Sequence, residues 1–275
     1  MTDSKRFDMA IELPRLGLGT WQNTDPAQCA ESVQNALEAG YRHIDTAQGY
    51  DNEAAVGRGI EQADVDRDDI FVATKVSTGN LAYDDVLSST AESREKLGVD
   101  VIDLLYIHWP TNTYDPEETL AAFDELVDDG VIRHVGVSNF EPPQLEEARE
   151  LLDAPIAANQ IEMHALLQQD ELRADAIQHD YWVVAYCPLA RGTIFDHDVI
   201  ADIADDHQVT PAQVALAWLL EQEQVAAIPK ATGKDHILEN LAATEIELST
   251  DAIERINGLS ENHRIVDFDS APWNW

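Results

Sequence analysis

The chain has 275 residues, 44% of them hydrophobic, and 53 acidic against 17 basic residues give it a formal net charge of −36. That length suits one α/β barrel with a large core, while so acidic a surface repels nucleic acid and anionic membranes. No run of about 18 apolar residues is present, which excludes a helix that spans a membrane.

Short apolar runs alternate with helical segments along the whole chain. We predict strands at residues 16–19, 42–45, 70–75, 101–107, 131–137, 156–159, 182–186 and 225–228. We predict helices at about residues 25–40, 52–62, 84–97, 115–130, 142–151, 169–179, 210–222, 235–243 and 250–257. Asp25-Pro26 and Thr210-Pro211 are typical helix starts, with a cap residue and then proline, and Gly40 and Gly98 are typical helix ends.

Eight strand-helix units, with no linker rich in Pro, Gly or Ser, predict a single domain over residues 1–275. The expected fold is an α/β (β/α)8 TIM barrel. An open doubly wound sheet is the alternative, but Gly17-Leu18-Gly19-Thr20 lacks the third glycine of the dinucleotide fingerprint. Residues 259–275 have no clear period, and we expect them to form a C-terminal tail over the mouth of the barrel.

Polar residues end or directly follow most of the predicted strands. They are Asp45, Lys75, His108, Ser138-Asn139, Gln160, Tyr186 and Lys230. In a barrel these strand ends meet at one mouth, where active sites lie, so we predict the site there. For any one of them a satisfied structural group is an equal alternative, and Asp45 with Lys75 could form a buried ion pair that serves only the fold.

Several stretches resemble the aldo-keto reductases, most closely their short microbial, diketogluconate-reductase-like members. The matching stretches, in chain order, are Gly19-Thr20-Trp21, residues 40–50 with Asn52-Glu53, Thr74-Lys75, residues 105–110, residues 136–140, residues 159–162, residues 186–189, Ile228-Pro229-Lys230 and Glu239-Asn240. They are spread over nearly the whole length of the chain. On this resemblance, the catalytic tetrad of the family falls on Asp45, Tyr50, Lys75 and His108.

Those four residues suit the reduction of a carbonyl group. A hydride added to the carbonyl carbon leaves charge on oxygen, which needs a proton and an electrostatic partner. Tyr50 is a phenol with an ordinary pKa of about 10, so it is protonated at neutral pH and can donate. We expect Lys75 to lower the pKa of Tyr50, Asp45 to hold Lys75, and His108 to bond the carbonyl oxygen. Because no side chain supplies a hydride, a nicotinamide cofactor is required.

The resemblance also implies how the cofactor binds. Tyr186 should stack on the nicotinamide, and Ser138, Asn139 and Gln160 should bond its carboxamide. The complete set of implied cofactor contacts is Gly19, Thr20, Trp21, Asp45, Ser138, Asn139, Gln160, Tyr186, Cys187, Pro188, Leu189, Arg191, Lys230, Ala231, Thr232, His236, Glu239 and Asn240. The residues from Cys187 to Arg191 should meet the pyrophosphate, and those from Lys230 onward the adenosine end.

Three positions depart from the pattern of the relatives. Ala231 and His236 stand where many NADP-binding relatives have serine and arginine, which weakens the grip on a 2′-phosphate. NADP(H) remains the first choice of cofactor, with NAD(H) as the alternative. Ser77 replaces a tryptophan beside the substrate, which predicts a wider or more polar pocket. The expected substrate pocket comprises Trp21, Ser77, Trp109 and Trp273, and the expected partner is a small carbonyl compound.

Other readings stay open at this point. The chain could bind a cofactor without turnover, work in the oxidative direction, or be a metal-dependent hydrolase that uses His43, His108 and His164, although these lack a short ligand spacing. The preferred interpretation has no metal.

Composition also bears on the setting of the protein. The two cysteines, Cys29 and Cys187, are expected to be reduced thiols. The first eight residues lack an apolar signal core, so we expect a cytoplasmic protein, and we expect a monomer. The charge of −36 indicates adaptation to molar salt, where the Debye length is only about 3 Å and self-repulsion is screened.

Overall fold

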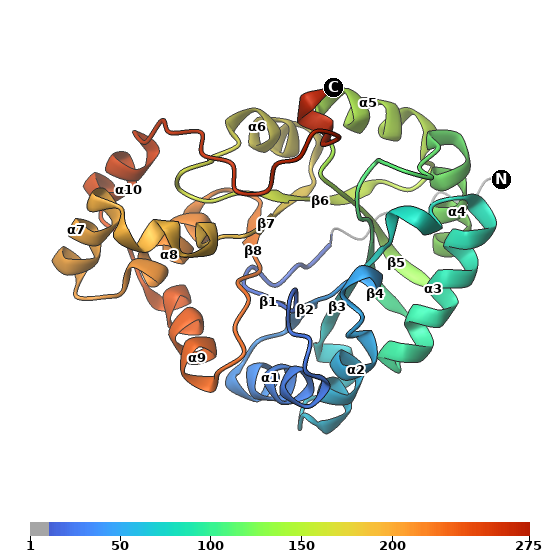
Figure 1. Cartoon of the computed structure of the whole chain (residues 1–275), viewed down its shortest axis with the longest axis horizontal. Coiled ribbons are helices and arrows are strands. Elements are labelled where there is room, and N and C mark those ends of the chain that lie inside the picture. The colour runs from blue at the N-terminus through green and yellow to red at the C-terminus, as the bar shows by residue number, and fades with distance from the viewer. Residues whose placement is uncertain (1–10) are drawn as a thin grey trace.

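The computed structural model describes residues 11–275, in which eight parallel strands curl into a barrel surrounded by helices (Figure 1). The strands are β1 (Leu18–Gly19), β2 (His43–Asp45), β3 (Phe71–Val76), β4 (Ile102–Ile107), β5 (Ile132–Ser138), β6 (Ile156–Glu162), β7 (Trp182–Tyr186) and β8 (Val225–Ala227). They pair in chain order from β1 to β8. The predicted barrel is confirmed for these residues; the first ten, including the segment examined for a signal core, lie outside the described part.

Helices cover the outside of the barrel. They are α1 (Pro26–Ala39), α2 (Glu53–Gln62), α3 (Tyr83–Leu97), α4 (Pro116–Asp128), α5 (Pro142–Leu151), α6 (Asp170–His179), α7 (Asp198–His207), α8 (Pro211–Glu221), α9 (Lys234–Ala242) and α10 (Thr250–Asn257). The start signals behave as expected: Asp25 accepts hydrogen bonds from two backbone N–H groups of α1, and Thr210 forms a capping box with Gln213. Among the described helices none is long and apolar enough to cross a membrane.

Backbone hydrogen bonds between the first and last strands close the barrel. The N–H of Gly17 donates to the carbonyl of Ala227 at 2.9 Å, and the N–H of Gly19 donates to that of Pro229 at 3.1 Å. A Cβ atom on Gly19 would lie 2.6 Å from the carbonyl oxygen of Ile228, so glycine is required for this approach. The closure brings the loop after β1 beside the loop after β8, two segments that sequence reasoning assigned to the same site.

Two apolar cores hold the architecture together. The larger one lies between the strands and the helices, and the smaller one fills the barrel interior around Leu104, Tyr106 and Val184. Gly136 on β5 makes room for the interior ring, because a Cβ there would lie 2.5 Å from Tyr106. Tyr106 in turn lies below the site, with the Lys75 ammonium 5.8 Å from its ring centre.

One helix was missed by sequence reasoning, which placed a single helix between the last two strands. The structure has α7 and α8 there, preceded by a 3₁₀ segment, Ala190–Asp196. The buried residues of α7, Ile200, Ile203 and Ala204, do have helical spacing. Their signal is masked by four aspartates in a ten-residue helix, because Asp is a weak helix former. β6 is also longer than predicted, since its polar end residues are buried instead of lying in a loop.

Candidate active site

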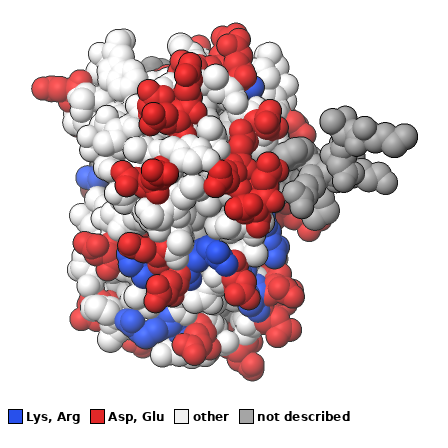
Figure 2. Space-filling view, turned by 90° about the vertical axis from the view of Figure 1, so that its right-hand side faces the viewer, with Lys and Arg blue, Asp and Glu red and all other residues white. Residues whose placement is uncertain are grey.

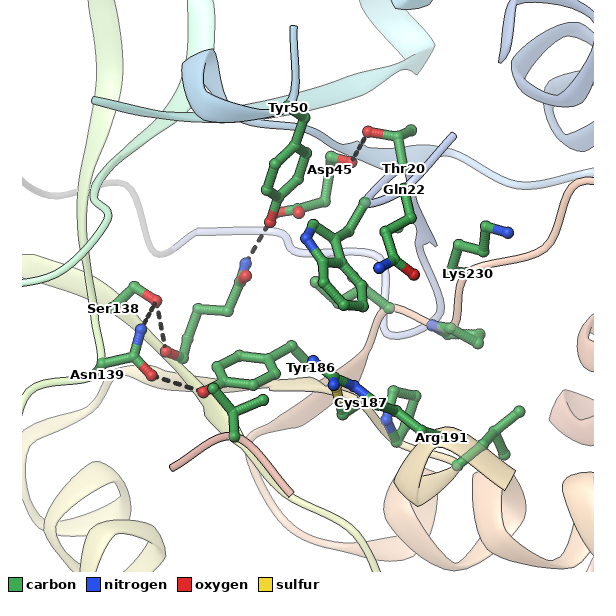
Figure 3. Close-up of a pocket in the computed structure, with 18 of the residues that line it drawn as sticks. Thr20, Gln22, Asp45, Tyr50, Ser138, Asn139, Tyr186, Cys187, Arg191 and Lys230 are labelled. Carbon is green, nitrogen blue, oxygen red and sulfur yellow. Dashed lines mark hydrogen bonds between the residues drawn. The ribbon is translucent and has the colours of Figure 1, made fainter. Parts of the chain in front are cut away.

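A cavity of about 670 Å³ opens at the C-terminal ends of the strands (Figure 3). It is lined by Gly19, Thr20, Trp21, Gln22, Asp45, Gly49, Tyr50, His108, Trp109, Ser138, Asn139, Gln160, Tyr186, Cys187, Pro188, Leu189, Arg191, Gly192, Phe195, Ile228, Pro229, Lys230 and Val266. The mouth of the barrel thus gathers residues from nearly every strand end, as parallel strands require.

Asp45 and Lys75 form a buried ion pair at the floor of this cavity. Parallel pairing of β2 with β3 places them on adjacent strands, and the Lys75 Nζ lies 2.5 Å from Asp45 Oδ1. The ammonium also donates to the carbonyl of Thr46 at 2.8 Å, while Asp45 Oδ2 accepts from the Gln160 amide at 2.7 Å. Both side chains are at most 2% exposed, so the pair is held in one geometry.

Tyr50 ends the 3₁₀ turn Gln48–Tyr50, which follows β2. Gln48 fixes this turn: its side-chain oxygen accepts from the Ser77 N–H at 3.0 Å, and its amide donates to Ser93 at 3.2 Å. The Tyr50 ring then lies against two other predicted residues. Its centroid is 5.1 Å from the Lys75 ammonium and 5.8 Å from the His108 ring, which it meets edge-on. The four residues of the predicted tetrad are therefore brought together.

The protonation behaviour of Tyr50 differs from the expectation. We expected Lys75 to lower the pKa of the phenol, but that pKa is raised well above its usual value, by burial first and then by the charge of Asp45. The prediction was wrong because the Lys75 ammonium is directed at Asp45 and at the Thr46 carbonyl. Burial also lowers the pKa of Lys75, against the opposing effect of Asp45.

His108 is neutral in this site. Burial, and next the charge of Lys75, lower the pKa of its imidazole to about 3. A neutral imidazole keeps one N–H, so His108 can donate one hydrogen bond to an oxygen in the cavity without adding a positive charge.

A hydrogen-bonded row connects β5, β6 and β7 along another wall of the cavity (Figure 3). Ser138 donates to the carbonyl of Gln160 at 2.8 Å, and the Asn139 amide donates to Ser138 at 2.9 Å. The Tyr186 hydroxyl donates to Asn139 Oδ1 at 2.8 Å. This row orients one amide, that of Asn139, and one aromatic ring, that of Tyr186, toward the cavity before any ligand binds, which suits a flat ring that carries a carboxamide.

The outer wall of the cavity comes from the strained segment after β7. Cys187, Ala190 and Arg191 have positive φ angles of 49°, 47° and 50°, unusual for residues other than glycine and typical of ligand sites. The guanidinium of Arg191 lies over the ring of Trp21, which follows β1, at 4.6 Å from the ring centre. Lys230 also lines the cavity. Two lysine or arginine side chains at one end of a cavity in so acidic a chain fit a ligand with phosphate groups.

Some predicted contacts lie outside this cavity. The Ser77 hydroxyl lies next to Gly49, 3.4 Å from where a Cβ atom on that glycine would be. Trp273 packs on Trp109 with ring centres 5.7 Å apart. Neither Ser77 nor Trp273 lines the cavity itself. The remaining adenosine-side predictions are on or just before α9: Ala231, Thr232, His236, Glu239 and Asn240. Of these, Ala231 and Asn240 are buried and His236 is exposed.

Sequence reasoning missed several lining residues: Gln22, Gly49, Gly192, Phe195, Ile228, Pro229 and Val266. Most of them adjoin predicted ones, so their neighbours could have indicated them. Phe195 and Val266 had no such signal, because they belong to segments without helical or strand periodicity. Val266 brings the C-terminal segment to the cavity.

The three histidines considered for a metal are held by different partners. His43 lies against Pro14 and Phe71, His108 against Tyr50, and His164 against Glu162. Within residues 11–275, no group of three or more His, Cys, Asp or Glu side chains is arranged to hold a metal ion.

Comparison with known proteins agrees with this geometry. The family model described as "Aldo/keto reductase family" matches residues 15–261. A methylglyoxal reductase of Escherichia coli O157:H7 is 40% identical over 96% of this chain and its own full length. A 9,11-endoperoxide prostaglandin H2 reductase of Trypanosoma cruzi is 39% identical over 93% of this chain and 91% of its own.

Solved structures give the same picture. A candidate 2,5-diketo-D-gluconic acid reductase B superposes with a TM-score of 0.91 at 36% identity, covering 94% of this chain and 92% of its own. An aldo-keto reductase of Bombyx mori, solved in complex with NADP, superposes with a TM-score of 0.88 at 30% identity, covering 96% and 94%.

Proposed function

We propose that this chain, which belongs to the aldo/keto reductase family, reduces an aldehyde or ketone to the alcohol with a reduced nicotinamide cofactor. One observation carries the proposal: the Tyr50 phenol and the His108 imidazole face the same cavity above the buried Asp45–Lys75 pair. The names of the similar proteins, which are reductases of carbonyl and endoperoxide compounds, support it.

In this proposal Tyr50 is the proton donor. Its raised pKa keeps the phenol protonated at neutral pH, so the O–H bond breaks only when the carbonyl oxygen gains negative charge. The proton moves to that oxygen, and the phenolate left behind lies beside the Lys75 ammonium. Asp45 holds the ammonium in place, and the neutral His108 donates a hydrogen bond that fixes the carbonyl oxygen.

The cofactor supplies the hydride when it is bound. Tyr186 offers the ring face for the nicotinamide, and Ser138, Asn139 and Gln160 offer the polar groups for its carboxamide. Arg191 and Lys230 are the cations for the phosphates. We favour NADPH, because the similar Bombyx mori enzyme was solved with NADP, and keep NADH as the alternative because of Ala231 and His236.

The substrate is proposed to be a small aldehyde, ketone or keto sugar. Trp21 and Trp109 offer apolar walls next to the Tyr50 phenol, which suits a short carbon chain. Ser77 and Trp273 enter this proposal only as neighbours of that pocket. The physiological reaction can equally be the oxidation of the corresponding alcohol, because the same residues serve both directions.

The decisive experiment is a panel of aldehydes, ketones and keto sugars assayed with NADPH and NADH in molar KCl. We expect oxidation of reduced cofactor that depends on a carbonyl compound. Titration of cofactor fluorescence runs beside it. Binding without turnover of any compound would favour a cofactor-binding module, and no binding at all would contradict both functions.

We further propose that the protein works in concentrated salt, in the cytoplasm and as a monomer. Figure 2 shows acidic side chains spread over the visible face, with most of the basic ones in its lower half. With a net charge of −36, the folded chain repels itself in dilute buffer. Melting temperatures should therefore rise steeply from low to molar KCl. A flat profile would mean that the acidic surface serves another purpose.

A further inference from the structure

Glu162, the last residue of β6, holds two consecutive backbone N–H groups of the C-terminal segment. Its Oε1 accepts from the Ile265 N–H at 2.6 Å, and its Oε2 accepts from the Val266 N–H at 2.7 Å. His164 Nε2 lies 3.0 Å from Oε1. The carboxylate is fully buried, and bonds to a buried carboxylate are stronger than bonds between neutral groups.

We call residues 264–266, which include the two residues held by Glu162, the strap. Val266 lines the cavity. The Arg264 guanidinium covers the face of Trp273 at 3.8 Å, and Trp273 packs on Trp109, another lining residue. Figure 1 shows the red C-terminal segment running from α10 past α6 to the chain end. The strap therefore supports part of the wall of the cavity.

Few other bonds fix the strap. Between residues 260 and 275, all described, one further backbone N–H donates to the barrel: that of His263, to the Leu166 carbonyl at 2.8 Å. The bonds of Trp273 and Asn274 go to Asp267 and Phe268, within the same segment. Glu162 thus accepts two of the three backbone N–H bonds from this segment to the barrel, beside a 3.0 Å contact between Glu261 and His197 and the packing of Phe268 and Trp273 on Trp109.

We propose that Glu162 is a positioning residue that holds the strap against the pocket and so sets the affinity for the carbonyl substrate. The part of this inference that concerns substrate rests on the proposed function; the part that concerns the strap does not. Glu162→Gln keeps the size of the side chain, but an amide has one acceptor oxygen, and its NH2 group would face the second backbone N–H.

The chain offers a direct readout and a matched control. The peptide bond between Arg264 and Ile265 is a trypsin site, and its N–H is one of the two that Glu162 holds. Asp124 on α4 makes the same double contact elsewhere: its carboxylate accepts from the N–H groups of Asp153 and Ala154, both at 2.9 Å. Asp124→Asn therefore makes the same acid-to-amide change at a contact with two N–H groups outside the cavity, on a half-buried side chain.

In Glu162→Gln, we expect release of the peptide 265–275 by trypsin to speed up at least about tenfold, because loss of one charge-assisted bond shifts a local opening equilibrium by about that factor. Hydrogen exchange at the Ile265 and Val266 amides should speed up in parallel. KM for the carbonyl should rise by about five- to twentyfold, with the cofactor dissociation constant within about threefold of wild type. Asp124→Asn should change none of these.

The outcomes separate the two proposals. If cleavage and exchange speed up but no carbonyl is ever reduced, the strap is supported and the proposed function fails. If reduction works and neither cleavage, exchange nor KM responds to Glu162→Gln, the role of Glu162 is wrong. Should the variant fail to fold, the wild type decides: its Ile265 and Val266 amides must exchange more slowly than those of Glu261 and Asn262, and equal rates would overturn the proposal.

Discussion

Two buried aspartates at opposite ends of the barrel are paired in different ways. At the N-terminal end of β4, Asp103 accepts from the Val72 N–H at 2.9 Å and pairs with Arg67 at 2.7 Å and Arg133 at 3.3 Å. The two arginines are 32% and 54% exposed, so they keep contact with water. At the mouth, Asp45 pairs with a lysine that is only 1% exposed.

The difference indicates that the Asp103 cluster serves the stability of the fold, whereas the Asp45–Lys75 pair fits the proposed function. Partly hydrated arginines lose little solvation when they pair with Asp103, so the bottom cluster stabilises the fold at small cost. Burial of the Lys75 ammonium is expensive, and its lowered pKa reports that cost. An apolar pair would serve the fold as well at that place. The structural alternative for Asp45 and Lys75 therefore explains less than a catalytic one, because the cost makes sense only where a fixed charge is needed.

The largest effect should come from Tyr50→Phe at the mouth. The substitution keeps the ring and its packing but removes the proton, so turnover should fall by at least about 100-fold. Cofactor affinity should change little, and the free energy of unfolding should stay within about 1 kcal/mol, because the lost hydroxyl faces a cavity. Single-turnover reduction rates and urea unfolding measure the two quantities. Near-normal rates under conditions where chemistry is rate-limiting would contradict the role of Tyr50 as proton donor.

At the N-terminal end of the barrel, a substitution should lower stability and leave turnover nearly unchanged. Asp103→Asn weakens the pairing with Arg67 and Arg133 and removes the charge that receives the Val72 N–H. We expect the free energy of unfolding to fall by about 2 kcal/mol, a modest loss because the arginines remain solvated. Turnover should remain within about twofold of wild type. A loss of turnover at unchanged stability would contradict the division of roles between the two ends.

The same contrast shows what a sequence can predict here. The apolar run of β4 and the helix starts at Asp25 and Thr210 are local signals, and they gave the barrel. The polar strand ends predicted Asp45, Lys75 and His108, because all parallel strands deliver their C-terminal residues to one mouth, whereas Tyr50 was assigned by the resemblance to the aldo-keto reductases. The pKa of Tyr50 could not be obtained in this way, since it depends on burial by residues distant in sequence. Val266 could not be found either, because an irregular tail places it.

Acid should destabilise both ends of the barrel in the same way, because each end holds a buried histidine that is neutral in the folded state. His43 at the bottom is buried, and burial lowers the pKa of its imidazole from 6.5 to about 4. A ring kept neutral in the folded state contributes its full stability above about pH 6.5 and loses it as the pH falls toward 4. Between pH 7.5 and 5.5, this single group should cost about 1–2 kcal/mol of unfolding free energy.

The measurement is urea unfolding at the two pH values in molar KCl, for wild type, His43→Gln and His108→Gln. Each variant should lose about 1–2 kcal/mol of the pH dependence, since burial also lowers the pKa of His108, to about 3. Identical pH dependence in all three proteins would show that these rings are not held neutral by burial.

The smallest effect is expected at the outer edge of the mouth, where side chains are exposed. His236 lies in the first turn of α9, next to Lys234, and a helix N-terminus favours phosphate. We expect His236→Arg to strengthen NADPH binding by about 1–2 kcal/mol, because it adds a permanent charge that can bond the 2′-phosphate. NADH lacks that phosphate and should gain much less. His179→Arg, which adds the same charge at the end of α6, is the control and should leave both affinities unchanged. Dissociation constants must be compared at one salt concentration, because screening weakens exposed charges. Equal gains for both cofactors, or none, would mean that α9 does not face the 2′-position, and the adenosine end would then have to be placed elsewhere.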